Sequence, residues 1–246
     1  MSVEYGIVNL NLVPVRKKNN AKSEMISQLF FGELIEITSR KKNWSLVVSN
    51  IDKYIGWIRT SHFLAISKSD YIKLNNKKKI FSNTEISISN KKIKKYTIPS
   101  GSLISNCNYL GFSYDLNNEK FNSIEEISMT FLNAPYLWGG KTKFGTDCSG
   151  FVQTVFKIYG KILPRDAYEQ ALEGVEVTSV KNSKTGDLAF FGKKINVITH
   201  VGIIISTNKI IHSSGTVRID KINDDGIFHP DLKEISHDLK LIRRII

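Results

Sequence analysis

The sequence Thr146-Asp147-Cys148-Ser149-Gly150-Phe151-Val152 places a cysteine at the predicted start of a helix. Thr146 or Asp147 can cap this helix by accepting a hydrogen bond from one of its first amides. Apolar residues then recur at helical spacing, and Gly160 ends the pattern: Val152, Val155, Phe156 and Tyr159. Because free amides and the positive end of the helix dipole stabilise a thiolate, this position favours a reactive Cys148.

Two histidines follow at the ends of predicted strands. His200 begins the apolar run 200–205, and His212 ends the next strand. If these strands are antiparallel neighbours, His200 can act as a base while His212 holds it in one tautomer. The free amide of Cys148 and the phenol of Tyr136 can donate to an oxyanion. This set predicts a cysteine hydrolase or acyltransferase. A zinc site made of Cys148, His200 and His212 is the alternative, without the ligand spacing usual for zinc.

The composition is that of a globular protein, with 41% hydrophobic and 24% charged residues in 246. The net charge of +12 favours acidic partners, but a lysine excess among many Ile and Asn residues is also typical of an AT-rich genome. There is no Arg-rich stripe with interleaved aromatics, so we expect no nucleic-acid partner. The first residues lack a cationic and apolar leader, and no apolar run reaches eighteen residues, so we expect no membrane partner and a cytoplasmic location. Cys107 is expected to be a buried, unpaired thiol.

The residues before the thiol alternate between polar and apolar in short runs, which predicts small antiparallel barrels. Residues 1–62 resemble a bacterial SH3-like domain in Val13-Pro14-Val15-Arg16, the turn at Gly32 and the closing Gly56-Trp57-Ile58. Residues 63–118 are interpreted as a second, divergent SH3-like domain. The chain is thus expected to hold two small all-β barrels before a third domain.

Residues 119–246 combine helices and strands. Capping boxes at Ser123 to Glu126 and at Asp166 to Glu169 predict helices that end near Leu132 and at Gly174. Strand-like runs follow: 188–191, 200–205, 209–212 and 239–246. Helices first and an antiparallel sheet afterwards predict an α+β domain.

Six successive motifs of this third domain resemble the signatures of the NlpC-type cell-wall cysteine peptidases. They are Tyr136-x-Trp138-Gly139-Gly140, 146–152, Leu163-Pro164-Arg165, Gly186-Asp187-Leu188, His200-Val201-Gly202-Ile203 and 211–215. The resemblance implies a papain-like catalytic domain in which Cys148 is the nucleophile and His200 the base. It also implies that His212 orients His200, that Tyr136 is an oxyanion donor, and that no metal or cofactor takes part.

The order of domains is similar to that of γ-D-glutamyl-L-diamino-acid endopeptidases. In those enzymes the first SH3-like domain covers the cleft, and its acidic and aromatic residues recognise a free N-terminal L-alanine together with the Asp and Ser beside the cysteine. The resemblance therefore implies substrate binding by Asp147 and Ser149. The remaining candidates for substrate binding are Glu24 as the acid, Tyr54 or Trp57 as an aromatic wall, Trp138 and Arg165. Trp138 is alternatively a packing residue, and Arg165 alternatively forms an ion pair with Asp166.

The hypothesis from the sequence is a monomeric cysteine endopeptidase of cell-wall recycling. It would cut the bond between γ-D-glutamate and meso-diaminopimelate or L-lysine in peptidoglycan-derived peptides such as L-Ala-γ-D-Glu-diaminopimelate. Three alternatives stay open: an exported hydrolase of intact peptidoglycan, a non-catalytic muropeptide-binding protein, and a thiol acyltransferase with a non-peptide substrate.

Overall fold

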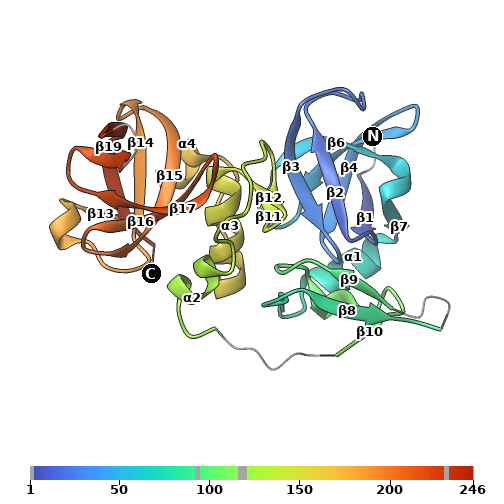
Figure 1. The fold of residues 1–246 in the computed structure, drawn as a ribbon. Coiled ribbons are helices and arrows are strands. Elements are labelled where there is room, and N and C mark those ends of the chain that lie inside the picture. The colour runs from blue at the N-terminus through green and yellow to red at the C-terminus, as the bar shows by residue number, and fades with distance from the viewer. Residues whose placement is uncertain (1–2, 92–94, 116–120, 230–232, 246) are drawn as a thin grey trace. The chain divides into compact units, whose positions relative to one another are not determined.

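The computed structural model describes residues 3–91, 95–115, 121–229 and 233–245. The chain divides into two compact units, Met1–Lys120 and Phe121–Ile246 (Figure 1). The domain boundary expected between residues 118 and 119 lies outside the described residues. None of the helices in the described ranges has the length and apolar character needed to span a membrane.

The first part of unit 1 is a seven-stranded antiparallel sheet in the order β3-β2-β6-β5-β4-β1-β7. Its strands are β1 (Glu4–Val8), β2 (Leu12–Arg16), β3 (Met25–Phe30), β4 (Leu34–Lys41), β5 (Trp44–Ser49), β6 (Ile55–Arg59) and β7 (Phe63–Ile66), with a short 3-10 turn at Thr60–His62. Alternate residues of these strands, including Val13, Val15, Ile35 and Val47, form one buried core. The short alternating strands expected for this segment are therefore present.

In the described residues, the rest of unit 1 is one helix and one small sheet. The helix is α1 (Lys68–Asn75), and Ser67 caps it by accepting from the amide of Asp70. The sheet has three strands in the order β10-β8-β9, namely β8 (Ile86–Ser89), β9 (Tyr96–Ile98) and β10 (Ser113–Tyr114), beside a 3-10 turn at Ile104–Asn106. A second SH3-like barrel is therefore not confirmed by the described residues of 63–118. Cys107 is buried and free, as expected.

The described residues of unit 2 contain three helices and a sheet that closes on itself. The helices are α2 (Ile124–Met129), α3 (Cys148–Tyr159) and α4 (Ala167–Gln170), with a 3-10 turn at Val180–Asn182. The strands are β11 (Lys141–Thr142), β12 (Gly145–Thr146), β13 (Val175–Val177), β14 (Leu188–Lys194), β15 (Val197–Ser206), β16 (Lys209–Ser214), β17 (Thr216–Ile222), β18 (Gly226–His229) and β19 (Glu234–Arg244). The main sheet has the order β13-β19-β14-β15-β16-β17-β18, and β18 also pairs with β19. Strands β14 to β19 thus form a closed antiparallel barrel.

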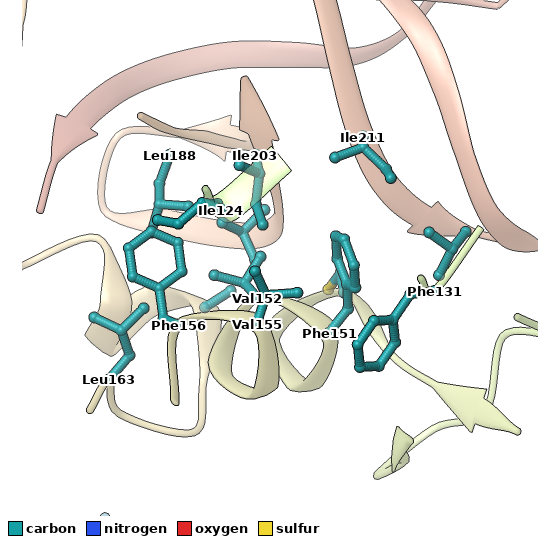
Figure 2. Packing of buried hydrophobic residues seen from close by; sticks show 14 of the residues in the cluster. Ile124, Phe131, Phe151, Val152, Val155, Phe156, Leu163, Leu188, Ile203 and Ile211 are labelled. Atoms are coloured by element: carbon teal, nitrogen blue, oxygen red, sulfur yellow. The ribbon is translucent and has the colours of Figure 1, made fainter. Parts of the chain in front are cut away.

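Helix α3 is capped and packed as its sequence predicts. The carboxylate of Asp147 accepts from the amide of Gly150, and Gly160 ends the helix in the left-handed region with φ of 99°. Its apolar side chains point at the strands β14, β15 and β16, where Leu188, Ile203 and Ile211 meet them (Figure 2). Burying such side chains contributes roughly 1.5–3 kcal/mol each, which holds the first residue of α3 firmly against the sheet.

The two smaller helices differ in length from the expected ones. Ser123 caps α2 as predicted, but the helix ends at Met129 and the carboxylate of Glu126 accepts from the amide of Asn122. Helix α4 is a single turn, because the chain leaves the helix four residues before Gly174, which adopts φ of +70°.

A second buried core, which includes Phe191, Ile204 and Ile210, fills the other face of the sheet.

Candidate active site

Cys148 is the first residue of α3 and is almost completely buried, with 7% of its surface exposed. Its sulfur accepts hydrogen bonds from two backbone amides, those of Ser149 and Val201. Val201 follows His200 on β15, so the thiol lies against the strand that carries the predicted base. The structure therefore brings the start of α3 and the beginning of β15 together.

The resting charge of the thiol differs from the sequence-based expectation. We expected the helix start to stabilise a thiolate, but burial and the nearby carboxylate of Asp147 raise the pKa of Cys148 to about 11. The amides of Val201 and Ser149 and the charge of Arg165 act in the opposite direction and are outweighed. Sulfur thus keeps its proton in the resting protein, and a base must remove it when the sulfur attacks.

His200 and His212 lie side by side, as predicted. Nε2 of His200 is 2.8 Å from Nδ1 of His212, and both rings are buried. The pairing of Gly202 with His212 makes His200 a diagonal neighbour of His212 across β15 and β16. Burial, followed by the neighbouring rings of His212 and His237, lowers the pKa of His200 well below its usual value. His200 is therefore a neutral imidazole that is able to accept a proton.

The absence of a side chain at Gly202 makes room for this pair. A Cβ atom at Gly202 would lie 2.9 Å from Cβ of His212 and 2.7 Å from Cδ1 of Ile210. Contacts this short force a neighbour to move, so only glycine fits opposite His212.

Two charged residues that the sequence reasoning missed extend the histidine pair. Nε2 of His212 is 3.0 Å from Oδ2 of Asp220, and Nη2 of Arg218 is 2.9 Å from Oδ1 of the same carboxylate. Arg218 lies directly opposite His212 in the ladder of β16 and β17. Alternation in residues 216–222 and the turn at Gly215 were the signals that could have placed both residues beside His212.

His237 also belongs to this cluster, although no sequence motif indicated a role for it. Its ring stacks on that of His200, with centroids 4.3 Å apart and an angle of 32° between the planes. His237 comes from β19, which reaches this position because β19 pairs with β14. Burial, above all, lowers the pKa of His237 to about 4, so this ring covers His200 as a neutral group.

The zinc alternative does not fit these contacts. His200 and His212 use one nitrogen each on one another, and the second nitrogen of His212 contacts Asp220. Within the described ranges, no three or more His, Cys, Asp or Glu side chains are arranged to hold a metal ion.

Tyr136 and Trp138 occupy the segment that precedes β11. The backbone of Tyr136 is held by its amide, which donates to the carbonyl of Gly215 at 2.8 Å. Burial first, and then the charges of Cys148 and Asp147, raise the pKa of Tyr136 to about 12. Its hydroxyl thus keeps its proton and lies within electrostatic range of the thiol. Trp138 is 58% exposed, so its ring is not part of the core.

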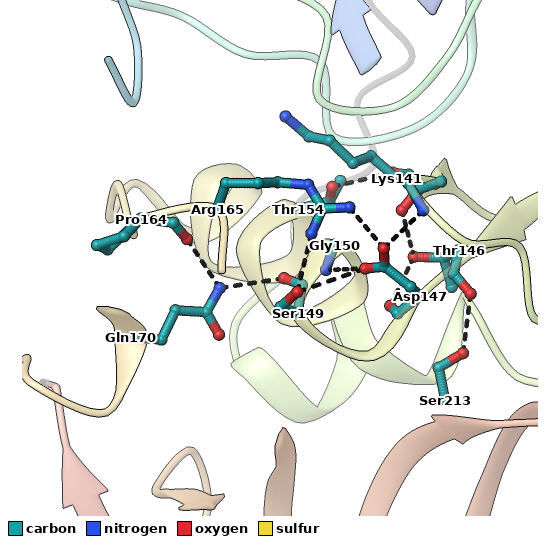
Figure 3. A network of polar contacts seen from close by, with 12 residues as sticks. Lys141, Thr146, Asp147, Ser149, Gly150, Thr154, Pro164, Arg165, Gln170 and Ser213 are labelled. Atoms are coloured by element: carbon teal, nitrogen blue, oxygen red, sulfur yellow. Dashed lines mark hydrogen bonds and ion pairs between the residues drawn. The ribbon is translucent and has the colours of Figure 1, made fainter. Parts of the chain in front are cut away.

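Asp147, Ser149 and Arg165 form one buried polar network (Figure 3). Oδ1 of Asp147 accepts from the amide of Gly150 at 2.7 Å, and Oδ2 accepts from the amide of Gly139 at 2.8 Å. Arg165 donates to Oδ2 of Asp147 at 2.5 Å and to Oγ of Ser149 at 2.8 Å. We expected an ion pair between Arg165 and Asp166, but the ion pair of Arg165 is with Asp147.

The three candidates in unit 1 have different surroundings. Glu24 forms an exposed ion pair with Lys17 at 3.0 Å. This ion pair lines a hollow of about 350 Å³. The other lining side chains are cationic or polar: Lys18, Asn20, Lys22 and Ser23. Tyr54 and Trp57 are half-buried, and Trp57 lies on β6 opposite Leu46.

Comparisons with known proteins match both parts of the chain. Residues 133–233 match the NlpC/P60 family, and residues 15–63 match a bacterial dipeptidyl-peptidase SH3 domain. Over 220 residues the chain is 30% identical to a gamma-D-glutamyl-L-lysine dipeptidyl-peptidase of Bacillus subtilis, which covers 77% of this chain and 72% of that protein. It is 48% identical over 80 residues to a murein DD-endopeptidase and LD-carboxypeptidase of Escherichia coli, across 32% of this chain and 42% of that protein.

The fold has a counterpart among solved structures. A crystal structure of an NlpC/P60 family protein from Bacillus cereus has a TM-score of 0.77 and covers 98% of this chain and 99% of that chain, at 17% identity. The sequence matches extend over both the peptidase segment and the SH3 segment. The chain therefore belongs to the NlpC/P60 family and is a cysteine peptidase with a bacterial SH3 domain ahead of its peptidase domain.

Proposed function

We propose that this peptidase hydrolyses the bond between γ-D-glutamate and a diamino acid in peptidoglycan peptides that have a free N-terminal L-alanine. The observation that carries the proposal is the thiol of Cys148 at the start of α3, beside the strand that presents the buried His200–His212 pair. The name of the Bacillus subtilis relative supports this bond and favours L-lysine as the diamino acid.

In the proposed reaction His200 removes the proton of Cys148 while the sulfur attacks the γ-carbonyl carbon of D-glutamate. The amide of Cys148 has no partner within its own helix turn, so it is able to donate to the oxyanion. Tyr136 is our candidate for the second donor, because its hydroxyl is protonated and within electrostatic range of the thiol. His200 then protonates the departing amine, and water, activated by His200, hydrolyses the thioester.

The polar network beside the thiol supports recognition of the acyl part of the substrate. Oγ of Ser149 accepts from Arg165 at 2.8 Å and donates to Oδ1 of Asp147 at 3.5 Å, a long contact that a carbonyl or carboxylate acceptor of the substrate would replace. Asp147 holds Arg165 and the helix start in place for this contact. Trp138 is our candidate for an apolar wall, since its ring is exposed two residues from Tyr136.

Glu24 remains our candidate for the acid that binds the free ammonium group, with Tyr54 or Trp57 as an aromatic wall. Replacement of Glu24 by Gln is expected to raise KM for the free tripeptide while the rate of alkylation of Cys148 stays constant. Equal KM values for both proteins would remove Glu24 from the set. Lys17, Lys18 and Lys22 line the same hollow as Glu24. The ammonium group of a ligand would meet like charges there, so the role of Glu24 depends on the outcome of this test.

The proposal is tested by mass spectrometry of products from a small set of peptides. The set contains L-Ala-γ-D-Glu-L-Lys, the corresponding meso-diaminopimelate peptide, and both peptides with an acetylated N-terminus. We expect the dipeptide and the free diamino acid from the first two only, inhibition by iodoacetamide, no effect of EDTA, and no product with Cys148→Ala. Binding without turnover by the unmodified protein would contradict the proposal.

We further propose that the enzyme works in the cytoplasm on recycled peptides. The requirement for a free L-alanine fits a substrate that has already been released from the wall. The competing activity is hydrolysis of intact peptidoglycan, which the identity to the Escherichia coli murein endopeptidase and the charge of +12 favour. Cleavage of the acetylated peptides or of isolated sacculi would support that second activity.

A further inference from the structure

The carboxylate of Asp220 is the fixed end of a buried chain of hydrogen bonds. Asp220 and His212 are both buried, and both carboxylate oxygens are in use, Oδ1 by Arg218 and Oδ2 by His212. An ionised carboxylate accepts hydrogen bonds and does not donate them. Nε2 of His212 must therefore carry a proton and donate it to Asp220.

The charge balance decides the state of the other nitrogen of His212. Arg218 already provides the cation that offsets Asp220. A second cation on His212 would be a net buried charge in a ring that is 1% exposed, next to His200 and His237. Such a charge is costly to bury. With its one proton on Nε2, neutral His212 presents the lone pair of Nδ1 to His200.

The contact of 2.8 Å between the two rings then needs a proton from His200. Nε2 of His200 carries that proton, so Nδ1 of His200 is unprotonated. We infer that Asp220, held by Arg218, is a positioning residue that fixes the proton order along His212 and His200 and leaves Nδ1 of His200 as the base. This inference rests on the proposed function, in which His200 accepts the proton of Cys148.

The proton balance of the reaction follows from this order. The S–H bond of Cys148 breaks, its proton joins Nδ1 of His200, and its electron pair forms the bond from sulfur to the carbonyl carbon. The new imidazolium charge is stabilised through His212 by the carboxylate of Asp220. When the C–N bond breaks, the same proton passes from Nδ1 to the leaving amine, and the original order is restored.

The replacement Asp220→Asn gives a sharp test because Arg218 dictates how an asparagine must lie. Arg218 only donates, so the amide oxygen must face Arg218 and the NH2 group must face His212. The hydrogen bonds from residue 220 to His212 and from His212 to His200 then both change direction, and Nδ1 of His200 becomes protonated. We expect kcat to fall about a hundredfold or more, since a comparable swap in a serine protease triad costs roughly 10⁴, while KM changes little.

The variant Arg218→Met separates this mechanism from a general loss of structure. Arg218 is 30% exposed, and Asp220 still accepts from His212 without it, so we expect an effect of only a few-fold. In the double variant Asp220→Asn with Arg218→Met, the asparagine is free to turn its oxygen to His212. We therefore expect the double variant to be at least about tenfold more active than Asp220→Asn alone, in line with strong coupling between contacting residues. A double variant as slow as Asp220→Asn, or slower, would overturn the inference.

A spectroscopic readout makes the inference independent of the substrate. Nitrogen NMR of ¹⁵N-histidine-labelled full-length protein without substrate should show His200 protonated at Nε2, and at Nδ1 in Asp220→Asn. A wild-type protein with the proton on Nδ1 overturns the inference even if peptides are cut. If the order is as inferred but no peptide is hydrolysed, the proposed function fails alone. The exposed Asp225→Asn serves as the matched control and should change neither readout.

Asp220→Glu keeps the test decisive if Asp220→Asn does not fold. A glutamate still only accepts, so the wild-type proton order should persist in the NMR spectrum, with reduced kcat because the longer side chain shifts the contact. A reversed order in Asp220→Glu would contradict the role assigned to the carboxylate.

Discussion

Replacement of the buried Arg165 by Met should destabilise unit 2 far more than the loss of an exposed arginine destabilises unit 1. Arg165 is 2% exposed and forms its ion pair with the carboxylate of Asp147, of which 6% is exposed. Removing one partner of a buried pair costs roughly 3–5 kcal/mol, because the other charge remains buried. Asp147 keeps the amides of Gly139 and Gly150, so we expect the lower value, about 3 kcal/mol.

Native-state hydrogen exchange followed by mass spectrometry measures this effect in the full-length chain. Peptides from α3 should exchange roughly a hundredfold faster in Arg165→Met, since each 1.36 kcal/mol is a factor of about ten. The matched control is Arg40→Met in unit 1, where the ion pair with Glu4 has side chains that are 36% and 51% exposed. Its loss should change exchange in β4 by less than about tenfold, as is usual for a surface pair.

A second variant tests the reason for the cost. Asp147→Asn combined with Arg165→Met removes both charges and keeps a good N-cap, because asparagine caps helices as well as aspartate does. We expect this double variant to be more stable than Arg165→Met. The reasoning would be refuted if Arg165→Met cost less than about 1 kcal/mol, or if the second replacement added a further loss of similar size.

Three further outcomes follow from the same site. Gly202→Ala should lower kcat at least about tenfold, because the new methyl group displaces His212. The same overpacking should lower the melting temperature, so steady-state kinetics at a temperature where the variant is fully folded would locate the effect in the site. The free energy of unfolding should fall on acidification from pH 6.5 to about 4. His237 and His200 have lowered pKa values in the folded protein, so the unfolded chain binds more protons in this pH range. The melting temperature of His237→Asn should fall less across the same range. Alkylation of Cys148 by iodoacetamide should keep accelerating up to about pH 10, and a plateau near pH 7 would contradict the raised pKa of the thiol.

Local sequence patterns predicted the start of α3 and the histidine pair well. The cap at Asp147 and the end at Gly160 depend on residues close together in the chain, and their chemistry leaves few alternatives. His200 and His212 lie on consecutive strands, so a simple hairpin was enough to place them side by side. Six motifs in order also resembled those of the NlpC-type peptidases, and the comparisons confirm this family.

The missed residues depend on contacts that local patterns do not contain. Asp220 reaches His212 only because the turn at Gly215 fixes the register of β16 and β17. His237 reaches His200 because β19 pairs with β14, whose paired residues lie about fifty positions earlier in the chain. The buried partner of Arg165 was also missed, since Asp147 becomes its neighbour through the fold rather than through the sequence. Burial likewise outweighs the stabilising effect of the helix start on the thiolate.

Strand β19 links the integrity of the barrel to the ability to cut peptides. It pairs with β13, β14 and β18, and it supplies the ring that covers His200. If β19 detached from its neighbours, the imidazole of His200 would be exposed to water. Protonation of that ring would become easier, and a protonated ring cannot accept the proton of Cys148. The free energy that opens β19 is therefore expected to set the fraction of molecules able to cleave peptides.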